Sequence, residues 1–360
     1  MSEAVPAVQA ARDPLASRIP ITVITGFLGS GKTTLLGKLL RHPGMDRAAV
    51  VINEFGDVPL DHELVASSTE RTALLASGCL CCTLRTDLQE TLRDLYARRR
   101  AGEVIDFDRI FVETTGLADP VPVLHSLQTD GFLAAHFRLN GVVTLVDAVN
   151  GSGQLDREPE AVKQAAVADR LVVTKTDIAG ADDVAALRER LARLNPYARI
   201  ATAVAGELDP RFLADIAPAS AAAGDDELDR WLPRAAAALA QSGEPRLFER
   251  PIWAGGPHDA RVRSFCLRFD EPFTWDALHT VLETLAALRG PDLLRMKGIV
   301  RVVGEPGPVV VQGAQHVFHE PVRLAATGTS EPGSRIVFIV RDIAPDAVRA
   351  LFAAVAGLAS

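Results

Sequence analysis

Several residues of this chain have types and spacings suited to phosphate chemistry. GFLGSGKT at 26–33 matches the pattern G-x-x-x-x-G-K-[ST], between an apolar run that predicts a buried strand and a stretch that predicts a helix. Glycines let backbone N–H groups surround phosphates, and the helix N-terminus adds a positive dipole. Lys32 is expected to reach the outer phosphates and Thr33 to ligate Mg²⁺. The pattern predicts a nucleoside triphosphate site at Gly26, Gly29, Ser30, Gly31, Lys32, Thr33 and Thr34.

Two further motifs follow predicted strands. ETTG begins at Glu113, where a carboxylate at the end of a strand suits Mg²⁺ or its water shell, and Gly116 would let the backbone approach the γ-phosphate. We therefore take Lys32, Thr33 and Glu113 as the catalytic candidates. The alternative for ETTG is a structural strand end followed by a turn.

TKTD at 174–177 resembles the N-K-x-D motif with which GTPases recognise guanine. In that interpretation Asp177 accepts hydrogen bonds from the guanine edge and Lys175 covers the ring, although Thr174 replaces the usual asparagine. Taken alone, TKTD could also be a strand end that caps the next helix. Its position after the fifth predicted strand favours GTP as the nucleotide.

Three of the four cysteines lie together in GCLCC, at Cys79, Cys81 and Cys82. Thiolates are good ligands for Zn²⁺ and Co²⁺, and three sulfurs in a tight turn can converge on one ion. A fourth position left open would suit metal delivery. Buried apolar cysteines or a redox pair are the alternatives, whereas Cys266, in an alternating strand, is expected to belong to the core.

Other polar side chains offer weaker candidates. Glu54, Asp57, Asp61, His62 and Glu63 follow the second predicted strand, where a mobile switch is expected. Each could be a transient metal contact, and a solvated charged loop is an equal alternative. His316 and His319 could contact a metal or a partner, but we favour structural histidines at a strand edge.

Composition limits the class of protein. The chain has 360 residues, is 48% hydrophobic and carries a formal net charge of -8, so it lacks the basic field expected of a nucleic-acid-binding protein. We find neither a signal-peptide core nor a long uncharged apolar run. Together with the clustered cysteines, this predicts a cytoplasmic protein with no membrane partner.

Short, wholly apolar strands alternate with helices from Ile21 to about Leu213, which is typical of a mostly parallel α/β sheet. Strands are predicted at 21–25, 48–53, 109–113, 141–147, 170–174 and 199–204, with helices at 32–41, 85–100 and 182–194. A smaller α+β unit follows, with strands at 262–269, 299–303, 309–312, 322–326 and 335–340 and helices at 274–288 and 345–355. We expect a tail (1–19), a P-loop domain (20–216), a linker with one helix (217–260) and a C-terminal domain (261–360).

Taken together, GFLGSGKTTLL, INEFGD, GCLCC, ETTGLADP and TKTD, in this order, closely resemble the CobW-like metallochaperone GTPases, which are relatives of the nickel-handling GTPases. RMKGIV at 295–300 and QHVFHEP at 315–321 also resemble the family's C-terminal domain. The resemblance implies slow GTP hydrolysis, Zn²⁺ or Co²⁺ at Cys79, Cys81 and Cys82, and a client protein that receives the metal. Related GTPases often form homodimers, for which the sequence itself gives no signature.

Two other functions remain open at this point. One is a P-loop ATPase or kinase that carries no metal, with structural cysteines. The other is a metal-sensing or buffering module in which the nucleotide is only a ligand. Competition between ATP and GTP tests the first, and single-turnover hydrolysis tests the second.

Overall fold

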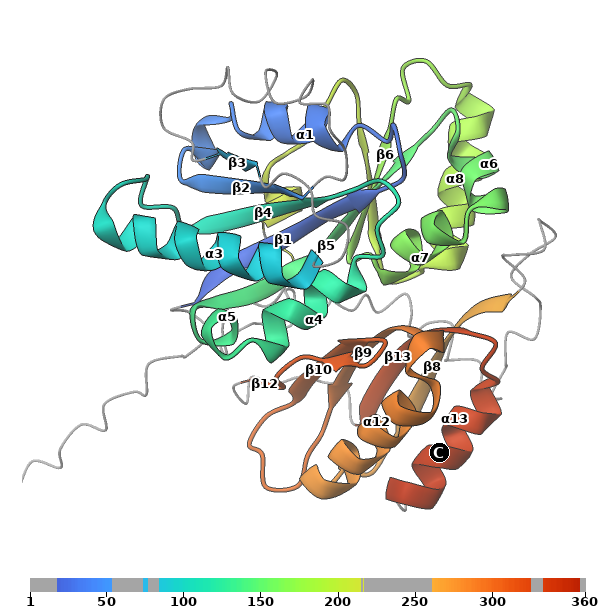
Figure 1. Cartoon of the computed structure of the whole chain (residues 1–360). Helices are drawn as coiled ribbons and strands as arrows, with labels where there is room; N and C mark the ends of the chain where they lie inside the picture. The colour runs from blue at the N-terminus through green and yellow to red at the C-terminus, as the bar shows by residue number, and fades with distance from the viewer. Residues whose placement is uncertain are drawn as a thin grey trace, which may run out of the picture.

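The computed structural model describes residues 18–53, 74–76, 84–214, 216, 261–324 and 333–356. They form two units, each with its own sheet, that pack against one another (Figure 1). The fold class expected from the sequence, an α/β P-loop domain followed by a smaller α+β domain, is confirmed. The exact domain boundaries stay a prediction, and the expected linker helix lies outside the described residues.

The first sheet is parallel throughout, in the order β3-β2-β4-β1-β5-β6-β7. Its central strands are buried on both faces, which explains their continuous apolar sequences. The strands are β1 (Ile19–Gly26), β2 (Ala48–Asn53), β3 (Leu74–Ala76), β4 (Arg109–Thr114), β5 (Phe137–Asp147), β6 (Arg170–Thr174) and β7 (Arg199–Ala203).

Helices cover both faces of this sheet. Leucines of α1 and α9 pack on one face, and α3, α4, α5, α7 and α8 cover the other. The helices are α1 (Lys32–Leu39), α3 (Leu84–Ala101), α4 (Val121–Thr129), α5 (Gly131–His136), α6 (Gly151–Arg157), α7 (Pro159–Val167), α8 (Ala181–Leu194) and α9 (Arg211–Ala214), with a 3₁₀ turn at Pro43–Met45.

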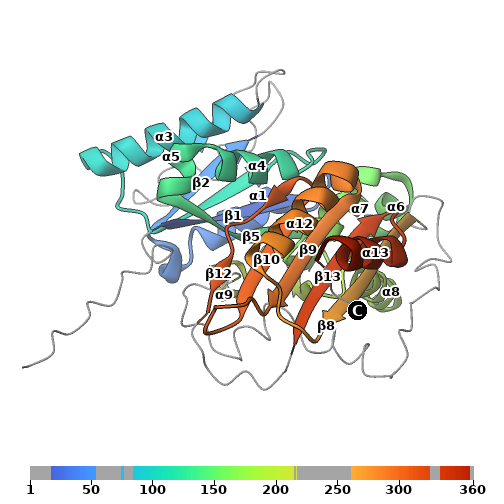
Figure 2. The same cartoon turned by 90° about the horizontal axis from the view of Figure 1, so that it is seen from below.

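The second sheet is antiparallel, in the order β11-β10-β9-β13-β8, with β12 paired to β10. Two helices, α12 and α13, cover the face that is turned away from the first domain (Figure 2). The elements are β8 (Val262–Phe269), α12 (Trp275–Arg289), a 3₁₀ turn (Gly290–Asp292), β9 (Leu293–Val300), β10 (Val309–Ala314), β11 (Val317–Phe318), β12 (Val322–Arg323), β13 (Ser334–Arg341) and α13 (Pro345–Ala356).

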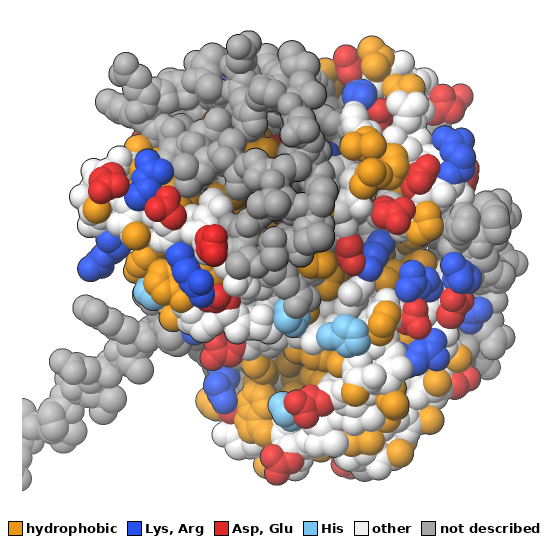
Figure 3. Space-filling view, in the orientation of Figure 1, with side chains coloured by type: hydrophobic (Ala, Val, Ile, Leu, Met, Phe, Trp, Pro, Cys, Tyr) orange, Lys and Arg blue, Asp and Glu red, His pale blue; other side chains and the backbone are white. Residues whose placement is uncertain are grey.

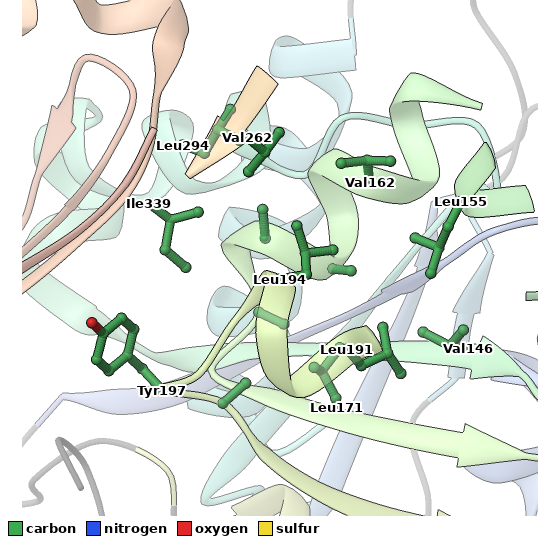
Figure 4. Packing of buried hydrophobic residues seen from close by; sticks show 14 of the residues in the cluster. Val146, Leu155, Val162, Leu171, Leu191, Leu194, Tyr197, Val262, Leu294 and Ile339 are labelled. Atoms are coloured by element: carbon green, nitrogen blue, oxygen red, sulfur yellow. The ribbon is translucent and has the colours of Figure 1, made fainter. Parts of the chain in front are cut away.

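The two domains share a continuous apolar core. Side chains of α7 and α8 pack with side chains of β8, β9 and β13 in one cluster, seen at close range in Figure 4. Charges are buried beside it, because Asp169 of the first domain accepts contacts of 2.6 Å from both Arg295 and Lys297 of β9. The labelled residues in this cluster include Val162, Leu194, Val262, Leu294 and Ile339.

Most predicted elements lie within a few residues of the observed ones, but β9 was misplaced. The sequence predicted a strand at 299–303, whereas β9 runs from Leu293 to Val300. Arg295 and Lys297 interrupt the apolar pattern, and the sequence does not show that Asp169 pairs with both of them inside the core. The strand expected at 322–326 is confined to Val322–Arg323 among the described residues, and β3 and the helices from α4 to α7 were not predicted.

Within the described ranges, none of the helices has the length and apolar character that a membrane span requires.

Candidate nucleotide-binding site

The phosphate loop lies between β1 and α1, as its sequence predicts. β1 ends at Gly26 and α1 begins at Lys32. Gly29 and Gly31 have φ angles of 72° and 90°, a left-handed conformation that favours glycine. At Gly26 a side chain would lie 2.4 Å from the backbone oxygen of Leu145, so the loop needs glycine for its close approach to β5.

Lys32 spans this loop from inside. Its Nζ donates to the carbonyl oxygens of Gly26, at 3.0 Å, and Phe27, at 3.4 Å. The side chain is 7% exposed, so the ammonium group is held in the concavity of the loop rather than in solvent. This location suits a cation that binds the outer phosphates.

The side chains of Thr33, in the first turn of α1, and Glu113, on β4, lie side by side. The Thr33 hydroxyl donates to Glu113 Oε1 at 3.0 Å, and Glu113 is fully buried at the end of β4. A second hydrogen bond, of 2.8 Å from Thr114 to Thr25, ties the end of β4 to β1. A hydroxyl and a carboxylate side by side are oxygen ligands of the type that Mg²⁺ prefers.

The residues present fit a magnesium nucleotide. The loop supplies backbone N–H groups at two left-handed glycines, one enclosed ammonium group and an adjacent pair of oxygen ligands. Ser30 is fully buried, and within the described residues its hydroxyl has no hydrogen-bond partner. A phosphate oxygen would satisfy such a group. Thr34 is exposed at the start of α1, beside the loop.

The end of β6 lies beside the phosphate loop. The Thr174 hydroxyl donates to the carbonyl oxygen of Ser30 at 2.8 Å, so this threonine ties the TKTD segment to the loop. Lys175 follows with a φ of 58°, and its Nζ lies 2.8 Å from Asp147 Oδ2. Asp177 is exposed, which leaves its carboxylate accessible to a base.

Asp147 is a site residue that the sequence analysis missed. It lies at the end of β5, and its oxygens accept hydrogen bonds from Lys175, from the Asn150 side chain and from the backbone of Val149. Burial alone would raise the pKa of Asp147, but the hydrogen bonds from Lys175 and Asn150 outweigh it and hold the pKa below its ordinary value. The sequence feature that could have identified Asp147 is its position at the end of the apolar run GVVTLVD.

The loop after β4 is packed between the phosphate loop and α7. A side chain at Gly116 would meet Leu28 of the phosphate loop at 2.6 to 2.8 Å. On its other side, Gln164 of α7 donates to the carbonyl oxygens of Gly116 and Ala118. The structure therefore brings ETTG, GFLGSGKT and TKTD to one edge of the sheet.

The predicted Zn²⁺ or Co²⁺ ligands Cys79, Cys81 and Cys82 lie outside the described residues, as do the charged residues from Glu54 to Glu63. Within the described ranges, no group of three or more His, Cys, Asp or Glu side chains could hold a metal ion. His316 is exposed and its Nδ1 lies 3.1 Å from the carbonyl oxygen of Ala286, whereas the Nε2 of His319 is buried. Cys266 lies on β8 and packs against the shared core, in agreement with its expected structural role.

The described surface has no single-sign field on the face drawn in Figure 3. Acidic and basic side chains are interspersed over the right-hand part of that view.

Comparison with known proteins gives consistent matches for both domains. The family model described as CobW/HypB/UreG, nucleotide-binding domain, matches residues 20–202, and the cobalamin synthesis protein cobW C-terminal domain matches residues 262–356. The chain is 33% identical to the zinc chaperone YjiA of Escherichia coli, over 93% of this chain and 98% of YjiA. It is 30% identical to the zinc chaperone CobW of Pseudomonas aeruginosa, over 84% and 82% of the two chains.

A solved structure agrees with these matches over both domains. The crystal structure of Zn(II)-bound YjiA GTPase from E. coli superimposes with a TM-score of 0.68 and 28% identity, and the match covers 94% of this chain and 99% of that one. Since both family models and a relative of nearly full length agree, the chain belongs to the CobW/HypB/UreG family, with a P-loop GTPase domain followed by a CobW-type C-terminal domain.

Proposed function

We propose that this GTPase binds Zn²⁺ or Co²⁺ through Cys79, Cys81 and Cys82 and delivers the ion to a client protein in a way that depends on the bound nucleotide. Membership of the family and the zinc chaperone names of two similar proteins support the proposal. Zn²⁺ is favoured over Co²⁺ by those names. The metal ion is cargo in this proposal, whereas GTP and Mg²⁺ belong to the switch.

We further propose specific roles for the nucleotide site. Lys32 binds the outer phosphates, while Thr33 and Glu113 hold Mg²⁺, which supplies charge neutralisation when it is bound. Lys175 covers the guanine ring and Asp177 accepts its edge. Support comes from the enclosure of Lys32 and the 3.0 Å contact between Thr33 and Glu113.

Gly116 has the role of sensor for the γ-phosphate in this proposal. The residue lies against Leu28 of the phosphate loop, so close that no side chain fits between them. A backbone that approaches the loop so closely can bind a terminal phosphate and can move when that phosphate is lost. Hydrolysis would thereby change the position of the segment that follows β4.

One observation carries the metal proposal. β3 runs parallel to β2, and β2 runs parallel to β4, so all three strands end at the same edge of the sheet. Glu113 lies at that edge, and Cys79 follows the last residue of β3, Ala76, after three positions. Three residues of chain span about 10 Å at most. The described end of β3 thus lies at the sheet edge that holds Glu113, which supports a cysteine site on the nucleotide side of the sheet.

Coupling between the nucleotide site and the metal site would link the affinities for GTP and for the metal quantitatively. If GTP tightens metal binding by a given factor, the metal must tighten GTP binding by the same factor. We expect Zn²⁺ to bind more tightly when a slowly hydrolysed GTP analogue is present than when GDP is present. Metal titrations of the full chain with the analogue, with GDP and without nucleotide measure this factor. Equal affinities in the three titrations would rule out the coupled mechanism.

A second experiment tests the ligands themselves. Replacing Cys79, Cys81 and Cys82 together by serine should abolish tight Zn²⁺ binding, because serine hydroxyls are far weaker zinc ligands than thiolates. Cys266→Ser is the matched control, since this cysteine packs on β8 in the second domain and should not affect metal affinity. Wild-type affinity in the triple variant would show that the metal binds elsewhere.

A further inference from the structure

Gln164 is a buried polar residue that the sequence motifs do not include. It lies on α7 with 1% of its surface exposed, and its Nε2 donates to the carbonyl oxygens of Gly116, at 3.1 Å, and Ala118, at 3.0 Å. Because both partners are carbonyl oxygens, the amide nitrogen must be the atom that faces them. One side chain thus holds two peptide groups of the loop that follows β4.

These two bonds fix a single turn. The N–H of Ala118 donates to the carbonyl oxygen of Thr115 at 3.1 Å, which closes a turn with Gly116 and Leu117 at its centre. In a trans peptide the C=O and N–H groups point in opposite directions. By drawing the carbonyl of Gly116 toward α7, Gln164 therefore directs the N–H of Leu117 away from α7.

The turn is also confined on its other side. Gly116 lies against the backbone and side chain of Leu28 in the phosphate loop, at distances that a methyl group could not occupy. Gln164 and Leu28 therefore hold the turn between α7 and the phosphate loop. A shift of the Gln164 amide would change the direction of the backbone N–H groups at the position where the terminal phosphate is expected.

α7 is well suited to act as a fixed support. The Asn195 side chain donates to the carbonyl oxygens of Ala165, Ala166 and Ala168, which satisfies the C-terminal end of the helix. Lys163, the residue before Gln164, forms a short ion pair with Asp119, which lies just after the turn. Two consecutive residues of one anchored helix thus hold the segment from Gly116 to Asp119.

The Gln164 amide uses its nitrogen on the loop but leaves its oxygen buried. Within the described part of the chain, the Oε1 atom of Gln164 is buried without a hydrogen-bond partner. An unsatisfied buried acceptor is unfavourable, whereas the two hydrogen bonds from Nε2 satisfy carbonyl oxygens of the turn that leucine would leave without this donor. The amide therefore acts on the loop through its two donated hydrogen bonds.

We propose that Gln164 is a positioning residue for GTP hydrolysis: it orients the Gly116–Ala118 turn so that its backbone N–H groups face the terminal phosphate. The inference rests on the sensing role proposed above for Gly116 and does not depend on metal delivery. It predicts that removing the amide affects GTP much more than GDP, because GDP lacks the phosphate that the turn contacts.

Gln164→Leu in the full chain is the direct test. We expect kcat to fall about tenfold, and the preference for a slowly hydrolysed GTP analogue over GDP to fall by a similar factor, because two hydrogen bonds are lost. The affinity for GDP should stay within about twofold of wild type, since GDP makes no contact with the turn. Unchanged kcat and unchanged nucleotide preference in the folded variant would overturn the proposal.

Thr144→Val is the matched control. The Thr144 hydroxyl donates to the backbone carbonyl of Gln164 at 2.7 Å and is equally buried, but it does not touch the turn. Thermal unfolding of both variants measures the structural effect of each lost hydrogen bond. If Thr144→Val loses as much nucleotide preference as Gln164→Leu, the role of Gln164 is only structural.

Gln164→Glu provides a pH profile that a structural role would not produce. A protonated carboxyl can still donate one hydrogen bond to the turn, whereas a carboxylate cannot. We expect kcat of this variant to fall as pH rises through the pKa of the introduced carboxyl, relative to wild type. A profile parallel to that of the wild-type protein would contradict the proposal.

Gly116→Ala separates this inference from the role of Gly116. If Gly116→Ala loses the preference for the GTP analogue while Gln164→Leu keeps it, only the role of Gln164 fails. If Gly116→Ala keeps the preference, the sensing role of Gly116 is wrong.

Discussion

The two ends of β6 show how differently charge is used in this molecule. At the carboxyl end, the partly exposed Lys175 pairs with the buried Asp147 beside the phosphate loop. Just before the amino end, Asp169 is buried against Arg295 and Lys297 of the second domain, with both contacts at 2.6 Å. One end leaves a cation partly exposed beside the phosphate loop, whereas the other encloses its charges between the domains.

The carboxylates at these two ends respond to different surroundings. Burial alone would raise the pKa of Asp169, but the Arg295 and Lys297 charges outweigh it and hold the pKa well below its ordinary value. Burial also lowers the pKa of Lys297 to about 8, which the charge of Asp169 opposes. Asp169 further accepts a hydrogen bond of 2.8 Å from the N–H of Val142 and is therefore tied to β5 as well. We therefore expect changes at the enclosed end to affect stability most, and changes at the open end to affect ligand selection.

Asp169→Asn should give the largest effect. The substitution removes the negative charge that Arg295 and Lys297 face in the core, which costs about 3–5 kcal/mol of the free energy of unfolding. Urea denaturation of the full chain at neutral pH measures the loss. A change below about 1 kcal/mol would show that the buried charges contribute little to the contact between the domains.

At the open end, Asp177→Asn should alter ligand choice rather than stability. Asparagine offers an N–H donor where guanine requires an acceptor, and it matches the 2-carbonyl of xanthine instead. We expect GTP affinity to fall about 100-fold, equivalent to roughly 3 kcal/mol, and XTP affinity to rise. Competition binding with the two nucleotides measures the exchange, and retained preference for GTP would place base recognition elsewhere.

The smallest expected effect comes from acid titration of His319 near the enclosed cluster. Burial, together with the Arg295 charge, lowers its pKa to about 3. Between pH 6.5 and 3 the unfolded chain binds a proton that the folded chain excludes, so stability falls as pH is lowered through that window. At pH 5 the loss is about 1–2 kcal/mol.

His319→Asn removes this titration, so its unfolding free energy should depend less on pH between 6.5 and 4. His279→Asn is the control, since the His279 side chain is 71% exposed. Denaturation curves at several pH values measure the slopes. Equal slopes in wild type and the His319 variant would show that another group causes the acid sensitivity.

The sequence predicts the open end of β6 far better than the enclosed end. A phosphate imposes glycines, a lysine and a hydroxyl at fixed spacing, so Gly26 to Thr33 can be recognised without coordinates. Glu113 and Thr174 follow from their places at strand ends. Asp147 was not identified as a site residue because it belongs to no motif, although it lies at the end of an apolar strand, as Glu113 does.

The enclosed end could not be predicted in the same way. Asp169 lies 126 residues before Arg295 in the chain, and no ligand fixes that spacing. Arg295 and Lys297 also make β9 hard to predict as a buried strand, because charged residues in a strand normally indicate a face exposed to solvent. Gln164 is a similar case, since its partners are backbone carbonyls that impose no side-chain pattern on the sequence.

The strand order of the second sheet has a consequence for how the chain folds during synthesis. β13 is made long after β8, yet it inserts between β8 and β9 and pairs with β8 along its whole length. Residues 334–341 must therefore leave the ribosome before β8 can pair with β13. Until then β8 and β9, which pack on α8 and α7, lack the strand that joins them, so a nascent chain stalled before β13 should depend on chaperones.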